Sequence, residues 1–159
     1  MPHLRLEIPE EWLADEFKKS SGLDVKKLLD HLVETVANLR MPSAANPSEM
    51  VPFINKINLK HGIVPLHYAH VAGDPAKRFL HVTLAAGNDT AGRTPEVRSH
   101  AAVTLGNEID KFIAAFPAIA STVASVTVWV QDIDRGRGYT TTGERKKARQ
   151  GKPIEDKQL

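Results

Sequence analysis

The chain has 159 residues and a mass of 17.5 kDa, which is the usual size of a single domain. Its hydrophobic fraction of 42% and charged fraction of 25% argue against a disordered, collagen-like or coiled-coil chain. The lack of cysteine excludes disulfides, cysteine-ligated zinc or iron–sulfur sites and thiol nucleophiles. No apolar run reaches the ~18 residues of a membrane span, and the start has no secretory-signal pattern, so we expect a soluble cytoplasmic protein.

The net charge of +2 is unevenly distributed along the chain. Residues 135–159 hold eight Lys or Arg and three Asp or Glu, a net of +5, whereas the residues before them have a net of −3. We therefore expect a single domain over 1–134, followed by a basic C-terminal tail over 135–159. The tail has one aromatic residue, Tyr139, and a solvated terminus or an arm around a neighbouring subunit suits it better than a nucleic-acid contact.

The first elements are a strand and a helix. Apolar side chains alternate with Arg5 and Glu7 over residues 4–8, which predicts a half-buried strand. Apolar residues then recur at helical spacing behind Asp24, a good N-cap, and predict a helix from about 24 to 40. The apolar positions of this helix are Val25, Leu28, Leu29, Leu32, Val36 and Leu39.

The middle of the chain predicts a long connection and two strands. Residues 41–60 are rich in proline and small polar residues, so we expect an elaborated connection with one short helical turn near 52–56. Strands are predicted over about 64–72 and 78–86, and the turn Ala72-Gly73-Asp74-Pro75 between them predicts a hairpin.

The last elements are a helix and a strand. Thr94 is a good N-cap and Pro95 suits the first helical position, so the apolar stripe that follows predicts a helix over 95–116. Pro117 helps to end it. The β-branched stretch over 124–133 predicts a final strand.

The order strand, helix, strand occurs twice, which predicts an α+β fold of two tandem βαβ units. Strands joined by a crossover helix normally lie parallel, so we expect a four-stranded sheet with both helices on one face. Side chains at neighbouring strand positions, such as Ile8 and Glu7 or Val128 and Trp129, point to opposite faces of the sheet. We interpret these pairs as apolar groups on both faces. An exposed apolar sheet face is rare, so we expect self-association.

Pro2 is the first candidate for chemistry. Initiator methionine is normally removed before a small residue, and the chain would then begin with a free proline, which is a secondary amine. The reference pKa of an α-amino group is about 8, and burial in an apolar pocket lowers it. Such an amine suits a general base near neutral pH. The alternative is that proline at this position is incidental.

Arg93 is the second candidate, because it lies between a predicted strand and a predicted helix, in AAGNDTAGRTPEVR. A guanidinium beside helix amides suits a carboxylate, since the fork binds both oxygens and the helix dipole favours an anion. The alternatives are a solvated loop cation or an ion pair with Glu96. Arg98, one turn into the helix, either assists or makes a surface or intersubunit contact.

The sequence contains no motif for a metal or a nucleotide. His3, His67, His70 and His81 all lie on predicted strands, and none has the HExxH spacing of a zinc enzyme. The ordinary interpretation of these four histidines is that they form hydrogen bonds within the sheet or at an interface. There is no GxGxxG, P-loop or GxSxG sequence, so we expect no metal and no cofactor.

Three stretches of sequence resemble one known family. They are MPHLRLEI, FLHVTLAAGNDTAGRTPEVRSHAAVTLGNEIDKFI and SVTVWVQDID, within residues 2–8 and 78–133. Together they resemble 5-carboxymethyl-2-hydroxymuconate isomerase of the tautomerase superfamily. The resemblance implies βαβ repeats packed as trimers. It also implies that Pro2 is the catalytic base and that Arg93, in the Gly-Arg-Thr position, binds the substrate carboxylate.

The sequence departs from the family in two places. Around the second strand the isomerase has an arginine where this chain reads HGIVPLHYAHVAG, and residues 41–60 look like an insertion. His67, Lys60 or a neighbouring subunit are the alternatives for the missing cation, with His67 as the tentative substrate-binding residue.

The predicted function is a cofactor-independent keto–enol tautomerase or double-bond isomerase. Its substrate would be a small unsaturated carboxylic acid with a 2-hydroxy or 2-oxo group, in the breakdown of aromatic compounds. We expect a homotrimer, with neither a membrane nor a nucleic acid as partner. The competing hypothesis is a catalytically degenerate tautomerase-fold module for binding or interaction, which the missing arginine supports.

Overall fold

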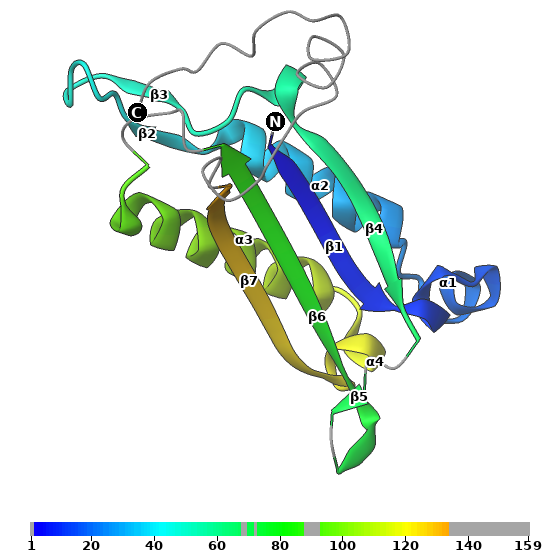
Figure 1. Cartoon of the computed structure of the whole chain (residues 1–159). Helices are drawn as coiled ribbons and strands as arrows, with labels where there is room; N and C mark the ends of the chain where they lie inside the picture. The colour runs from blue at the N-terminus through cyan, green and yellow to red at the C-terminus, as the bar shows by residue number, and fades with distance from the viewer. Residues whose placement is uncertain (1, 68–69, 72, 88–92, 134–159) are drawn as a thin grey trace, which may run out of the picture.

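Four long strands form one mixed sheet in the computed structural model of the chain (Figure 1). The structure describes residues 2–67, 70–71, 73–87 and 93–133, so the predicted tail lies outside the described residues. Across the sheet the strands are β4 (Lys60–Leu66), β1 (His3–Pro9), β6 (Asp74–Gly87) and β7 (Val123–Ile133). A two-residue strand, β5 (His70–Val71), pairs with the first part of β6.

The strand directions confirm the predicted tandem βαβ units. β1 is parallel to β4 and β6 is parallel to β7, whereas β1 and β6 are antiparallel. Helix α2 (Val25–Asn38) lies between β1 and β4 in the chain, and α3 (Pro95–Ala114) lies between β6 and β7. His3 is opposite both Lys60 of β4 and Ala85 of β6. The starts of β1 and β4 therefore meet the ends of β6 and β7 at one end of the sheet.

Both helices cover the same face of the sheet, as predicted (Figure 1). The side chain of Asp24 caps α2 by accepting a hydrogen bond from the N–H of Lys26 at 3.0 Å, and that of Thr94 caps α3 by accepting from Val97 at 3.4 Å. No helix in the described part of the chain is long and apolar enough to cross a membrane. The core between helices and sheet includes Leu4, Leu6, Ile8, Leu80, Val82 and Leu84 from the strands and Leu28, Leu32, Val36, Leu105 and Ile109 from the helices.

The opposite face of the sheet, which we call the open face, carries no helix in the described part of the chain and is mainly polar. On β1 it holds His3, Arg5 and Glu7, which alternate with the buried apolar residues of that strand. The prediction of apolar groups on both faces is therefore wrong for most positions, because the alternating pattern sends the apolar side chains to the helices. The exceptions include Val64 and Ala85, which pair with Glu7 and His3, and Trp129 of β7, which is 58% exposed beside His81.

The second strand differs most from the prediction. β4 begins at Lys60 and ends at Leu66, instead of covering 64–72. The predicted hairpin with the third strand forms only through His70 and Val71, at the end of the predicted second strand, because β4 pairs instead with the edge of β1 that β6 leaves open. The hairpin partner of β6 is the short β5, after a turn in which Gly73 has a φ of +84°.

Short elements surround this frame, and apart from one helical turn the sequence pattern did not predict them. They are the 3-10 turns η1 (Glu10–Leu13) and η2 (Lys56–Asn58), the helices α1 (Asp15–Ser21) and α4 (Pro117–Ala120), and the strands β2 (Arg40–Pro42) and β3 (Met50–Pro52). η2 begins where the helical turn predicted near 52–56 ends. β2 and β3 pair with each other and extend beyond the end of the main sheet (Figure 1). α3 stops two residues before its predicted end, and Pro117 begins α4.

Candidate functional site

A pocket of about 380 Å³ lies on the open face, at the end of the sheet where β1 begins. His3 and Arg5 of β1 line it, together with Lys60 of β4, Thr83 of β6 and Gln131 of β7. None of the described residues that line the pocket is acidic. We call it the cationic pocket. Positive and hydrogen-bonding side chains without a carboxylate suit a small anionic ligand.

Pro2 lies next to this pocket, because it contacts two of the residues that line it, His3 and Lys60. It directly precedes His3, and its carbonyl oxygen accepts a hydrogen bond of 3.0 Å from the backbone N–H of Lys60. Its exposure is intermediate. The pairing of β1 with β4 therefore holds the first residues of the chain beside a lysine.

The cations of the pocket act on the residue next to Pro2. The pKa of His3 lies below its ordinary value. Partial burial is the largest cause, followed by the positive charge of the amino terminus and then those of Lys60 and Arg5, which lower the pKa further because they disfavour a second positive charge nearby. This end of β1 thus has a positive electrostatic environment.

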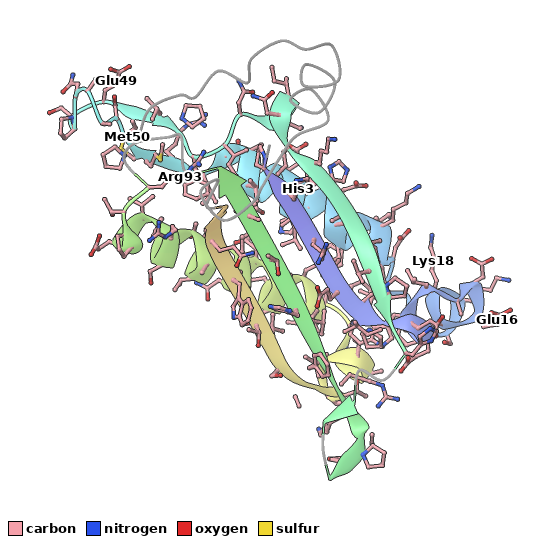
Figure 2. All side chains as sticks on the ribbon, viewed as in Figure 1. His3, Glu16, Lys18, Glu49, Met50 and Arg93 are labelled. Atoms are coloured by element: carbon pink, nitrogen blue, oxygen red, sulfur yellow. The ribbon has the colours of Figure 1, made fainter. Side chains whose placement is uncertain are left out.

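Arg93 lies at the same end of the sheet as His3, whereas Glu16 and Lys18 of α1 lie at the other end (Figure 2). Its Nε and Nη2 atoms donate to the carbonyl oxygen of Phe53 at 3.2 and 3.0 Å. The guanidinium carbon is 5.2 Å from the centre of the Phe53 ring, a cation–π contact. Phe53 is buried and follows β3, so Arg93 connects the start of α3 to the segment predicted as an insertion.

Arg98 supports the backbone of Arg93. Its Nη1 atom donates to the carbonyl oxygen of Arg93 at 3.0 Å, one turn away. The side chain of Thr94, between them, caps α3. The first turn of α3 and the loop before it are therefore joined by several hydrogen bonds, which fix the direction in which Arg93 leaves the backbone.

His67 lies at the opposite end of the sheet. It follows Leu66, which pairs with Pro9, the last residue of β1. A strand rises about 3.3 Å per residue, so the length of β1 places His67 roughly 20 Å from Pro2. Its Nδ1 atom contacts Oε2 of Glu10, and its side chain is 76% exposed. Within one chain the structure brings Pro2 together with Lys60 and does not bring His67 to them.

Sequence reasoning did not assign most of the lining of the cationic pocket. The alternation over 4–8 would have put His3 and Arg5 on one face of a strand, and this was the available signal. Thr83 and Gln131 line the pocket because of the strand pairing, and no local sequence signal predicts its register. Among the described residues, no group of His, Asp or Glu is placed to hold a metal ion.

The chain is similar in structure to several known proteins. One is a 5-carboxymethyl-2-hydroxymuconate delta-isomerase, with 16% identity and a TM-score of 0.61 over 89% of this chain and 87% of that one. Another is a 5-carboxymethyl-2-hydroxymuconate isomerase from Deinococcus radiodurans R1, with 19% identity and a TM-score of 0.58 over 88% of each chain. A third is a fused wild-type 4-OT symmetric trimer, with 12% identity and a TM-score of 0.52 over 89% of this chain and 94% of that one.

No protein-family model matches the chain, and no curated protein matches it in sequence. The similarity therefore lies in the structure, over nearly the whole length of each chain. At these identities it establishes the fold, and it confirms the fold that the sequence resemblance implied. The chain has the tandem βαβ fold of the tautomerases.

Proposed function

We propose that the chain is a cofactor-independent tautomerase or isomerase of small unsaturated carboxylic acids that carry a 2-hydroxy or 2-oxo group. The observation that carries the proposal is the cationic pocket beside Pro2, in a fold shared with two named isomerases. The pocket offers positive charge for a carboxylate. The terminal proline, once Met1 is removed, offers a base at the edge of that charge.

The proposed reaction needs one group that accepts and returns a proton. The neutral amine of Pro2 takes the proton of the enol hydroxyl, and the O–H electron pair forms the C=O bond. The C=C pair then takes a proton at carbon from the protonated amine, which becomes neutral again. For a double-bond shift, the amine takes the first proton from carbon instead. Such proton transfer contributes ~10²–10⁴-fold, and positioning supplies the rest.

The carboxylate of the substrate is proposed to bind Lys60 and Arg93. Lys60 lines the cationic pocket, opposite His3 in the strand register. Arg93 lies at the same end of the sheet, where its bonds to Phe53 orient the guanidinium. His67 keeps a role in this proposal only from a neighbouring subunit, because within its own chain it lies at the far end of β1.

The proposed assembly is a homotrimer in which other copies cover the open face of the sheet. Two observations support it. No described helix covers the open face, which presents Trp129 to solvent, and the fold is shared with a symmetric trimer. Burial of one exposed tryptophan from each copy favours association.

The base is tested with the wild type, Pro2→Ala, and a protein with one alanine inserted before Pro2. The assay follows the ultraviolet absorbance of the enol form of an aromatic 2-oxo acid as it becomes the keto form. The wild type should accelerate the reaction. Pro2→Ala should keep a measurable fraction, because a primary amine stands in nearly the same place, and the inserted residue should remove nearly all activity. Turnover by the inserted protein at the wild-type rate would rule out Pro2 as the base.

The second candidate function is a tautomerase-fold module that binds such acids without turnover. The contacts of Arg93 with Phe53 favour it, because they give this arginine a structural role. If the wild-type protein binds the acid at equilibrium and leaves its rate of ketonisation unchanged, that result would support the binding module over the enzyme.

A further inference from the structure

The surroundings of Pro2 combine charged side chains with apolar ones such as Val64 and Ala85. Pro2 has intermediate exposure, and the neighbouring pocket is lined by His3, Arg5 and Lys60. Burial alone is therefore a weak reason for a neutral amine at this position. A like charge within a few ångströms also favours the neutral form of an amine, because it repels the added proton.

Basic side chains next to Pro2 come from two strands, besides Arg93 at the same end of the sheet. β1 carries His3 and Arg5, and β4 carries Lys60 and His61. Lys60 is the nearest of the permanent cations in the strand pairing, because it is opposite His3 and its N–H binds the carbonyl of Pro2 at 3.0 Å. Paired strands lie about 4.8 Å apart, so the lysine stem begins within one strand spacing of the start of β1.

The other described residues that line the pocket do not offset that charge. The lining side chains of β6 and β7, Thr83 and Gln131, are neutral. Among the described residues of β1, the carboxylate on this face is that of Glu7, which lies further along the strand from Pro2. Its oxygens are 3.9 Å from Arg5 and 3.1 Å from His81, so it is already shared by two partners.

We propose that Lys60 tunes the amino terminus: its positive charge repels a proton on the Pro2 amine and so keeps that amine neutral, and basic, near neutral pH. The proposal rests on the proposed function for its biological use. It assigns Lys60 a role in the ligand-free protein, before any carboxylate is bound. The lowered pKa of His3, to which Lys60 contributes, agrees with a positive field at this end of β1.

The same charge links substrate binding to the strength of the base. A bound carboxylate beside Lys60 offsets the positive field, so the proton affinity of the amine rises once substrate is present. The acid limb of kcat should therefore lie at higher pH than the acid limb of kcat/KM, because the first reports the complex and the second the unbound enzyme. In Lys60→Met both limbs should lie at higher pH than in the wild type, because the repulsion from the lysine is lost in the free enzyme and in the complex alike.

The direct test measures the amine itself without substrate. An amine-reactive electrophile modifies the neutral form only, and mass spectrometry of the first peptide gives the rate of modification as a function of pH. Wild type, Lys60→Met and Lys60→Arg are compared. Lys26→Met is the matched control, because it removes the same charge from the exposed start of α2, at the far end of the sheet.

Lys60→Met should slow the modification about two- to tenfold at neutral pH, since a tenfold change corresponds to one pH unit in the titration. Lys60→Arg and Lys26→Met should match the wild type. In the wild type itself, raising the salt from ~0.01 to ~1 M shortens the screening length from ~30 to ~3 Å and should slow the modification in the same direction. A salt-independent rate, or a Lys60→Met rate equal to the wild type, overturns the proposal.

Failure of this inference is distinguishable from failure of the proposed function. If chemical blocking of the amine leaves turnover unchanged, Pro2 is not the base, but the modification rates still decide whether Lys60 acts on the amine. If blocking abolishes turnover while Lys60→Met leaves the modification rate unchanged, the base is correct and its tuning by Lys60 is wrong.

Discussion

Arg93 is the residue for which the structure adds most to the sequence argument. If it binds the substrate carboxylate, Arg93→Ala should lower kcat/KM by roughly 10- to 150-fold, because a hydrogen bond to a charged group contributes ~1.5–3 kcal/mol. Arg93→Lys keeps the charge and loses the two-pronged geometry, so it should restore only part of the rate. Steady-state kinetics on the enol assay give both values.

The bonds between Arg93 and Phe53 require a control for structure. Arg93→Ala also removes two hydrogen bonds to a buried segment, so its melting temperature should fall relative to the wild type. The matched variant is Arg98→Met, which removes a bond to the Arg93 backbone and leaves the Arg93 side chain in place. A folded Arg93→Ala protein with unchanged kcat/KM would exclude this arginine from the site.

The sequence predicted single residues where the signal is local. The caps Asp24 and Thr94 were found because a cap bonds to residues two or three positions away, and both bonds are present. Phe53 was not found as the partner of Arg93, because forty residues separate them and the bond uses a backbone carbonyl, which any residue could supply. Lys60 remained one of several alternatives for the same reason: its position beside Pro2 depends on strand pairing.

Elements with a strong period were predicted well. α2 and α3 each carry a continuous apolar stripe that packs against the sheet, and both were predicted to within two residues at each end. β7 was predicted to within one residue at its start. In these elements the local pattern and the tertiary burial agree, so the sequence alone is sufficient.

The second strand was predicted poorly because its burial pattern is weak. The residues of β4 are exposed or of intermediate exposure and show no clear alternation, since among the described strands β4 has β1 as its one neighbour. The hairpin of β2 and β3 has only three residues in each strand, too few for a period to be visible. Both segments owe their structure to tertiary contacts.

At the scale of the whole molecule, Trp129 offers a test of the proposed assembly. If copies of the chain cover the open face, Trp129→Asp places a carboxylate in the interface of every subunit and should convert the trimer largely to monomer at micromolar concentration. The fold of each chain should survive, because this side chain is 58% exposed in one chain. Sedimentation velocity distinguishes the two states.

Val103→Asp is the control for that experiment. Val103 is 59% exposed on α3, in the helical layer on the opposite side of the sheet, so the same charge there should leave the assembly unchanged. If wild type sediments as a monomer, the proposed trimer is wrong. If both variants dissociate equally, the open face is not the interface.

In the proposed mechanism the amine of Pro2 is free at the start of the mature chain, because Met1 has been removed, and it acts as the base. Its most direct test is the intact mass of a preparation that is active in the enol assay. The mass should be short of the full sequence by one methionine residue, which leaves Pro2 as a secondary amine beside Lys60. Full activity in a preparation that retains Met1 would contradict the account, because the proline nitrogen would then be an amide without basicity.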